Sequence, residues 1–295
     1  MKTIISTAAS LSALMFMAAC ATAPLSTVDP VKVDADFPPS LVELNFESHG
    51  DRLNGHAYLA EGEGPHPTVV LLHGFPGNER NLDLAQDLRS DGFNVLFFHY
   101  RGAWGSEGTY SFTHVIEDVA SATDMLRANT ETYRTDPEKL ILIGHSMGGF
   151  AALQAAARDE HITCVAGIAP ADLGAIANAF DTDPASAESF AAYSDTMQML
   201  AGLTGEAAVA EIMSNREAFN VGALAPKLSG KSVLLVAGDK DTSVPPDRVH
   251  APMVAAYEAE PGIDLTAKVL PGDHSFSWSR QELIDEVLDW AETCR

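Results

Sequence analysis

The sequence from residue 40 onward predicts an α/β fold built around a mostly parallel, doubly wound β-sheet. Two kinds of segment alternate in this part of the chain: short runs rich in branched apolar residues, and longer segments with apolar residues at helical spacing. Strands that alternate with helices are typical of βαβ units, whose helices cover both faces of the sheet. Ligands of such sheets bind where strands end, so the residues that directly follow each predicted strand are the candidates for a functional site.

Eight segments have the composition of strands, so we expect an eight-stranded sheet. The central segments are apolar at almost every position, as expected of parallel strands covered on both faces. The first two alternate between apolar and polar residues and predict an antiparallel hairpin at the edge of the sheet. The expected strands cover residues 41–46, 56–59, 68–72, 94–100, 140–143, 163–168, 232–237 and 265–270.

Helices are expected between the strands, where apolar residues recur every three to four positions. Residues 172–228 interrupt this alternation because they are rich in Ala and Met, carry several acids and have no strand pattern. We predict there a helical lid, inserted over the strand ends. Its larger apolar residues could line the substrate pocket, but most of them are expected to pack the lid onto the core. These residues are Met197, Met199, Leu200, Leu203 and Met213. The expected helices cover residues 81–91, 115–128, 151–158 and 281–292.

The first 39 residues are excluded from the predicted fold. Lys2 precedes an uncharged apolar run that ends in small residues, an order typical of a secretory signal. The run is short for a membrane-spanning helix. Residues 1–20 are therefore predicted to be a signal peptide. Residues 21–39, which are small, polar and proline-containing, are predicted to be a flexible tether. Residues 40–295 remain as one domain.

The end of this signal, Ala18-Ala19-Cys20, resembles the bacterial lipoprotein signal, in which the cysteine is lipidated and becomes the first residue. This hypothesis predicts export to the periplasm or cell surface, with acyl chains on Cys20 holding the protein on a membrane without a spanning helix. The alternative is an ordinary signal cleaved near Ala19 or Ala21, with no role for Cys20.

The composition excludes several classes of function. The formal net charge of −23 argues against nucleic-acid binding, which needs basic patches, and it repels anionic substrates. No group of Cys and His residues has metal-ligand spacing, so neither a required metal nor another cofactor is predicted. Cys164 and Cys294 lie far apart in the sequence, and a disulfide is not expected. Nothing indicates an obligate protein partner, and the oligomeric state stays open.

The segment Gly144-His145-Ser146-Met147-Gly148 is the main indication of chemistry. It follows an apolar strand and precedes an alanine-rich helical segment. In a Gly-x-Ser-x-Gly turn of this kind, the glycines let strand and helix approach each other, and the serine hydroxyl is exposed at the helix N-terminus. The alternative is a plain glycine-rich turn with a capping serine. The strand and helix on either side favour Ser146 as a nucleophile.

A serine hydroxyl needs a base, and the base needs a carboxylate to orient it. His274 lies between the last predicted strand and the last predicted helix, at the carboxyl edge of the sheet, and His114 is its main competitor. Asp239 and Asp241 both follow the preceding strand, and Asp241 is preferred because of its Gly-x-x-Asp spacing. The expected triad is Ser146, Asp241 and His274.

Two backbone amides are expected to bind the oxyanion that such a reaction forms. One belongs to Met147, directly after the nucleophile. The other belongs to Phe75 in the loop of residues 73–77, since Pro76 has no N–H. His73 is expected to hold this loop in shape, Arg101 is expected to be a structural anchor, and Trp104 either forms a pocket wall or packs the loop.

Together, these motifs resemble those of the α/β-hydrolase superfamily over residues 41–293. The matching features are the nucleophile turn, the His-Gly-x-x-Gly loop, Tyr-Arg-Gly-x-x-Gly-Ser at residues 100–106, Gly-x-x-Asp and Gly-Asp-His-Ser. The Tyr-Arg-Gly segment and residues 134–139 are similar to the branch of prolyl-oligopeptidase-like peptidases and broad carboxylesterases. The resemblance implies an α/β-hydrolase fold and hydrolysis through an acyl-enzyme. The chain has no room for the β-propeller of prolyl oligopeptidases, which favours a single-domain carboxylesterase acting on a small acyl substrate.

Two other hypotheses stay open. A serine peptidase acting on small peptides would use the same triad, and acids of the lid would then bind the free amino group of the substrate: Asp181, Asp183, Glu188 and Asp195. A non-catalytic surface-binding protein on a hydrolase scaffold is the alternative outside enzymes. Haloalkane dehalogenases and epoxide hydrolases need a carboxylate where Ser146 stands, so they are disfavoured.

Overall fold

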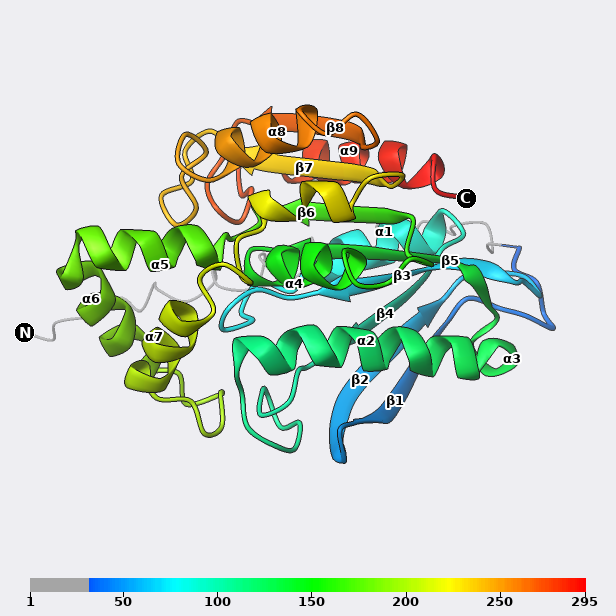
Figure 1. The fold of residues 1–295 in the computed structure, drawn as a ribbon. Helices are drawn as coiled ribbons and strands as arrows, with labels where there is room; N and C mark the ends of the chain where they lie inside the picture. Colours follow the sequence, from blue (N-terminus) through cyan, green and yellow to red (C-terminus); the bar gives the residue numbers. More distant parts are fainter. Residues whose placement is uncertain (1–31) are drawn as a thin grey trace, which may run out of the picture. The chain divides into compact units, whose positions relative to one another are not determined.

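The computed structural model describes residues 32–295, which form a single sheet flanked by helices (Figure 1). The predicted signal peptide and Cys20 lie outside the described residues. The sheet has eight strands in the order β1-β2-β4-β3-β5-β6-β7-β8. Its strands are β1 (Ser40–Ser48), β2 (Asp51–Leu59), β3 (His66–Leu72), β4 (Asn94–Phe98), β5 (Thr135–His145), β6 (Cys164–Ile168), β7 (Ser232–Gly238) and β8 (Asp264–Leu270).

The strand pairing confirms the predicted mostly parallel sheet. Strands β1 and β2 pair antiparallel, β2 pairs antiparallel with β4, and the other neighbours are parallel. Strand β4 is buried at every position, as is β6, whereas alternate residues of β1 are exposed. This difference in burial is the physical reason why the central strands are continuously apolar and the first strand alternates.

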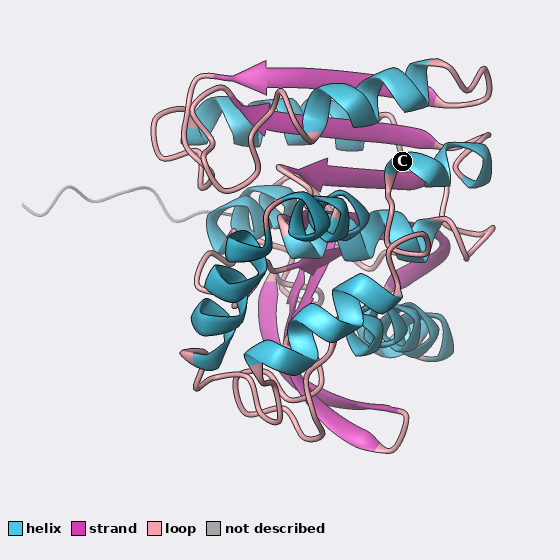
Figure 2. Cartoon of the chain, turned by 60° about the vertical axis from the view of Figure 1, so that its left-hand side comes forward, coloured by secondary structure: helices cyan, strands magenta, loops and turns pink. Residues whose placement is uncertain are grey.

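Helices cover both faces of the sheet (Figure 2), and each face has its own apolar core. Alternate residues of one strand face opposite sides: Val70 belongs to one core and Val69 to the other. The first core packs against α2 (Phe112–Ala128), α4 (Met147–Ala156) and α8 (His250–Glu258), and the second against α1 (Leu82–Ser90) and α9 (Arg280–Glu292). A short α3 (Thr130–Tyr133) follows α2.

Helix α8 was not predicted. His250 begins this helix and is only 6% exposed. The helix packs through Met253 and Tyr257, but small apolar residues also occupy its exposed side, so its sequence has no clear amphipathic pattern. Among residues 32–295, no helix is long and apolar enough to cross a membrane.

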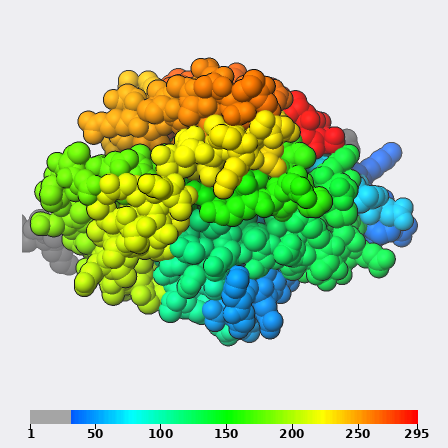
Figure 3. Space-filling view, in the orientation of Figure 1, coloured from blue at the N-terminus to red at the C-terminus, as the bar shows by residue number. Residues whose placement is uncertain are grey.

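The insertion between β6 and β7 comprises α5 (Leu173–Thr182), α6 (Pro184–Asp195), α7 (Gly205–Ser214) and the 3-10 helix η1 (Gly222–Lys227). It follows the carboxyl end of β6, and its surface is continuous with that of α2 (Figure 3). Glu211 of α7 accepts hydrogen bonds from the backbone amides of Phe112 and Thr113 at the N-terminus of α2, at 3.0 and 2.8 Å. The insertion is thereby fastened to helix α2 by a carboxylate at the N-terminus of that helix.

Backbone hydrogen bonds fasten the middle of the insertion. The amide of Ala201 donates to the carbonyl of Gly102, and the amide of Tyr110 donates to the carbonyl of Ala201, at 2.7 and 2.9 Å. The insertion is therefore hydrogen-bonded to the segment of residues 100–110.

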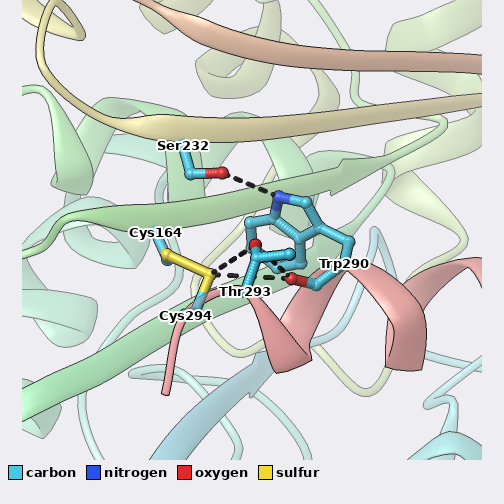
Figure 4. The surroundings of a disulfide bond; sticks show 5 residues. All are labelled: Cys164, Ser232, Trp290, Thr293 and Cys294. Atoms are coloured by element: carbon cyan, nitrogen blue, oxygen red, sulfur yellow. Dashed lines mark hydrogen bonds between the residues drawn. A yellow bond between two sulfur atoms is a disulfide. The ribbon is translucent and has the colours of Figure 1, made fainter.

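A disulfide joins Cys164 to Cys294, so the expectation that no disulfide forms was wrong (Figure 4). The two residues are 130 positions apart in sequence, but their Cα atoms are 6.2 Å apart. Helix α9 starts near the carboxyl edge of the sheet and runs back, so that its end reaches the amino ends of β6 and β7. There the indole nitrogen of Trp290 also donates to the hydroxyl of Ser232, at 3.1 Å. The direction of α9 brings the two cysteines together, and their spacing in the sequence does not indicate this.

Candidate active site

Ser146 stands in a strained turn between β5 and α4. Its φ of 58° and ψ of −120° lie where residues with side chains are rarely found. A Cβ on Gly144 would lie 2.0 Å from the carbonyl oxygen of Gly148, and one on Gly148 would lie 2.3 Å from that of Leu72. Glycine is therefore required at both positions. The turn exposes the Ser146 side chain at the carboxyl edge of the sheet, and the Ser146 amide is held by the carbonyl of Ile168 at 2.8 Å.

His274 and Asp241 are in direct contact. The Nδ1 atom of His274 lies 2.6 Å from Oδ2 of Asp241. The Asp241 side chain is completely buried, and its other oxygen accepts hydrogen bonds from the amides of Ser243 and Val244, both at 2.8 Å. These two amides fix the carboxylate, which in turn fixes the imidazole ring.

Asp239, the other candidate, does not contact His274. Its side chain accepts the amide of Gly272 at 2.9 Å and pairs with Lys240 at 3.1 Å. The Gly272 amide and the neighbouring ammonium group lower the pKa of Asp239. Asp239 therefore shapes the loop after β8, whereas Asp241 orients the histidine. His114 bonds to the carbonyl of Thr109 at 2.8 Å and belongs to the start of α2.

His145, the residue before Ser146, contacts His274. The Nε2 atom of His145 lies 2.8 Å from the carbonyl oxygen of His274, and the two rings are 4.7 Å apart between centroids. Within residues 32–295, no hydrogen bond joins the Ser146 hydroxyl to His274. Such bonds are often long in ligand-free enzymes and tighten when substrate binds. His145 is the site residue that sequence analysis missed, because it occupies a variable position of the motif.

The amide of Met147 and the loop that carries Phe75 both lie next to Ser146. Met147 is the first residue of α4, so its amide belongs to the free N–H groups of a helix N-terminus. A Cβ added to Gly74 would lie 3.0 Å from the Cβ of Ser146, so the loop of residues 73–77 passes directly beside the serine. This arrangement is suitable for two backbone donors to an oxygen bound next to Ser146.

His73 holds this loop in shape, as expected. It is fully buried, its Nδ1 donates to the carbonyl of Gly74 at 2.8 Å, and the hydroxyl of Tyr100 donates to its carbonyl at 2.9 Å. Its Nε2 lies 3.2 Å from Nδ1 of His99. Burial lowers the pKa of His73 to about 4, so the ring is neutral at physiological pH.

Of the two roles considered for Trp104, the structure shows packing against the 73–77 loop. Its indole nitrogen donates to the carbonyl of Pro76 at 2.7 Å, and the Arg80 guanidinium lies 4.5 Å from its ring centroid. Its backbone amide donates to the carbonyl of Met199 in the insertion, at 3.0 Å. Arg101 is a structural anchor, since its Nε pairs with the buried Asp118 at 2.6 Å.

The insertion covers the 73–77 loop with aromatic side chains. The ring of Phe75 stacks on Phe190 of α6, with centroids 6.0 Å apart, and lies 6.1 Å from Tyr193. The larger apolar residues of the insertion mainly pack it onto the core, because Met197 and Leu200 are buried. Met199, Leu203 and Met213 are partly buried against the same core.

Two of the four acids of the insertion are engaged within it. Asp181 pairs with Arg216 at 2.5 Å, and the carboxylate of Asp195 accepts the amide of Gly205 at 2.7 Å. Glu188 is exposed on α6, and Asp183 immediately precedes that helix. Among the described residues, no group of three or more His, Cys, Asp or Glu side chains has the geometry to hold a metal ion.

Comparison with known proteins gives relatives of two kinds. The uncharacterized protein YfhR of Escherichia coli strain K12 is 32% identical over 135 residues, which cover 44% of this chain and 46% of YfhR. Esterase EstD of Thermotoga maritima is 30% identical over 144 residues, covering 44% of this chain and 34% of EstD. The matched regions thus span less than half the length of these relatives.

Solved structures resemble the fold over a longer range. Est1E from Butyrivibrio proteoclasticus superposes with a TM-score of 0.64 at 21% identity, covering 86% of this chain and 98% of that one. The model of the family described as "Alpha/beta hydrolase family" matches residues 69–286, which include the nucleophile turn, both aspartates and His274. With a match over well more than half of its length, the chain belongs to the α/β-hydrolase family.

Proposed function

We propose that the protein is a serine hydrolase that cleaves carboxylic esters of small acyl substrates through an acyl-enzyme intermediate. Ser146 is the nucleophile, His274 the general base and Asp241 the residue that orients it. The observation that supports this proposal best is the pairing of His274 with a fully buried Asp241, beside a serine in a strained turn. A buried carboxylate held by two amides and offered to one imidazole nitrogen supports the assignment of Asp241 and His274 as the acid and the base of a triad.

In the proposed mechanism, His274 Nε2 takes the proton of Ser146 as the serine oxygen attacks the acyl carbon. The amides of Met147 and Phe75 bind the oxyanion of the tetrahedral intermediate. The C–O bond to the alcohol then breaks, and His274 gives its proton to the leaving oxygen. Water, deprotonated by the same histidine, attacks the acyl-enzyme and releases the acid. Asp241 stabilises the imidazolium in both halves of the reaction.

Two observations favour esters over peptides. A relative over part of the chain is named an esterase, and this activity is proposed here by analogy. Asp181 and Asp195 are engaged in contacts within the insertion, which leaves them less suited to bind the amino group of a peptide.

The charge of −23 and the absence of a predicted basic patch argue against nucleic acid as a partner.

We also propose that the protein is exported and held on a membrane through a lipid on Cys20. The Cys164–Cys294 disulfide supports export, because structural disulfides persist in oxidising compartments outside the cytosol. Cys20→Ala would then release the protein from the membrane fraction. Retention of this variant on the membrane would contradict the anchor.

The proposed activity is tested with p-nitrophenyl esters of increasing acyl length and with aminoacyl p-nitroanilides. We compare the wild type with Ser146→Ala and with a control, Ser90→Ala, which removes an exposed hydroxyl of α1. Ester cleavage that only Ser146→Ala abolishes supports the proposal, and the chain-length profile measures the acyl pocket. Anilide cleavage would favour a peptidase. No turnover of either class, together with no reaction of Ser146 with a fluorophosphonate, would favour a binding protein.

A further inference from the structure

His145 occupies the position between strand β5 and Ser146, and it is 3% exposed. Its Nε2 atom lies 2.8 Å from the backbone carbonyl oxygen of His274. A carbonyl oxygen can only accept a hydrogen bond, so Nε2 of His145 has to carry the proton. The His145 ring therefore contacts the backbone of His274, the proposed base. The two imidazole rings also pack against each other, with centroids 4.7 Å apart and planes tilted by 46°.

The other nitrogen of His145 has no such partner. Its Nδ1 is buried and makes no hydrogen bond to any of residues 32–295. A Cβ on Gly74 would lie 3.5 Å from it, so the 73–77 loop passes over this side of the ring. A proton on Nδ1 would be buried without an acceptor, which is costly, and the neutral form with hydrogen on Nε2 is favoured.

The surroundings of His145 lower its pKa to about 3, and burial is the largest cause. His274 and Arg280 act in the same direction as burial, whereas the His274 carbonyl and Asp241 oppose it. The ring is therefore neutral at the pH values at which hydrolases of this kind are assayed, and its donor to His274 is present throughout.

The His274 loop needs a contact of this kind because of the sheet topology. His274 follows β8, an edge strand that pairs only with β7, whereas Ser146 follows β5. Strands β6 and β7 lie between them, so the loop has to bridge three strand spacings, or roughly 14 Å. Asp241, after β7, holds the His274 side chain. His145, at the end of β5, holds the His274 backbone.

We infer that His145 is a positioning residue for the general base: its Nε2–H group fixes the backbone of His274 beside the nucleophile. This inference rests on the proposed function, since it assigns a role within the same site. It predicts that loss of the donor lowers kcat and leaves KM nearly unchanged, because the base, and not the substrate pocket, is displaced.

Three substitutions separate a hydrogen-bond donor from a space-filling side chain. The amide nitrogen of glutamine can occupy the position of Nε2, that of asparagine corresponds to Nδ1, and leucine has no donor. We expect His145→Asn and His145→Leu to lower kcat about 100-fold, the order found when a catalytic group is misplaced by about 1 Å. His145→Gln should retain kcat within about tenfold of the wild type.

The control is His161→Leu, which changes an exposed histidine in the loop after α4 and should leave kcat unaltered. Equal kcat values for the Gln, Asn and Leu variants would overturn the inference, as would an effect confined to KM. If Ser146→Ala is as active as the wild type, the proposed function fails. If Ser146 is essential and the three variants are alike, only the positioning role fails.

A second measurement needs no substrate, and a variant is used only to assign the signals. Long-range ¹H–¹⁵N spectra of the histidine-labelled wild type report which ring nitrogen carries hydrogen, and His145→Gln assigns the signals. We expect His145 to remain neutral, with hydrogen on Nε2, from pH 5.5 to pH 8. Hydrogen on Nδ1 in that range, in either the other tautomer or the cation, would overturn the inference whatever the kcat values of the variants.

Discussion

Removing the Cys164–Cys294 disulfide by Cys294→Ser should lower the free energy of unfolding by about 2 to 5 kcal/mol. The link closes a loop of 130 residues, and its effect on the entropy of the unfolded chain has an upper limit of about 5 kcal/mol. Cys294 is partly buried near the chain end, so the replacement creates little cavity. The effect on activity should be small, because the disulfide lies at the amino edge of the sheet and Ser146 at the carboxyl edge.

The assay is urea unfolding of protein that begins after Cys20, so that Cys164 and Cys294 are its only cysteines. The wild type should lose stability when reductant is added, down to the level of Cys294→Ser, and reductant should not affect the variant. Thiol titration of the unreduced, unfolded wild type should find no free thiol. Two free thiols, or equal unfolding midpoints for the wild type and the variant without reductant, would refute this account of the disulfide.

Three further predictions follow from the site. Asp241→Asn should lower kcat about 10⁴-fold, the order known for triad aspartates, whereas Asp239→Asn should stay within about tenfold; equal losses would contradict the choice of Asp241. His73 and His145 are buried and neutral, with pKa values of about 4 and 3 against an ordinary 6.5, and take up protons only on unfolding. Each of them should therefore lower the free energy of unfolding, measured with urea, by about 1.4 kcal/mol when the pH falls from 7.5 to 5.5. His145→Gln should lose about this much less stability over the same range than the wild type, and a difference of less than half this amount would count against neutral burial. Phe190→Ala removes an aromatic contact with the 73–77 loop worth about 1 kcal/mol, so kcat/KM for esters should fall about fivefold. An unchanged kcat/KM would show that α6 does not affect the site.

The fold was predictable because buried strands and amphipathic helices leave local patterns. Strand β4 is buried throughout and apolar throughout, so pattern and structure coincide. Strand β5 begins five residues earlier than predicted, because residues 136–139 are only partly buried or exposed, and three of them are charged, which masks the strand. Helix α8 was missed for a different reason, since apolar residues lie on its exposed side as well as on its buried side.

Contacts between segments distant in sequence were less predictable. Spacing after β7 favoured Asp241, and the structure pairs it with His274, but spacing alone cannot tell which carboxylate is turned inward. The role of His145 depends on a carbonyl 129 residues away, and the disulfide depends on the direction in which α9 returns. Trp104, for which two roles were considered, is assigned by its hydrogen bond to Pro76. Each of these contacts is created by the sheet order and not by neighbouring residues.

The most direct test of the central claim is to identify the residue that a fluorophosphonate modifies. Such reagents react with a serine that is activated by a base, and the modified peptide is found by mass spectrometry. We predict a single modification, on Ser146. It should not form on protein that is denatured beforehand, and it should form much more slowly in His274→Ala. Modification of another serine at the same rate, or an unreactive Ser146 in the folded protein, would contradict the assignment of this site.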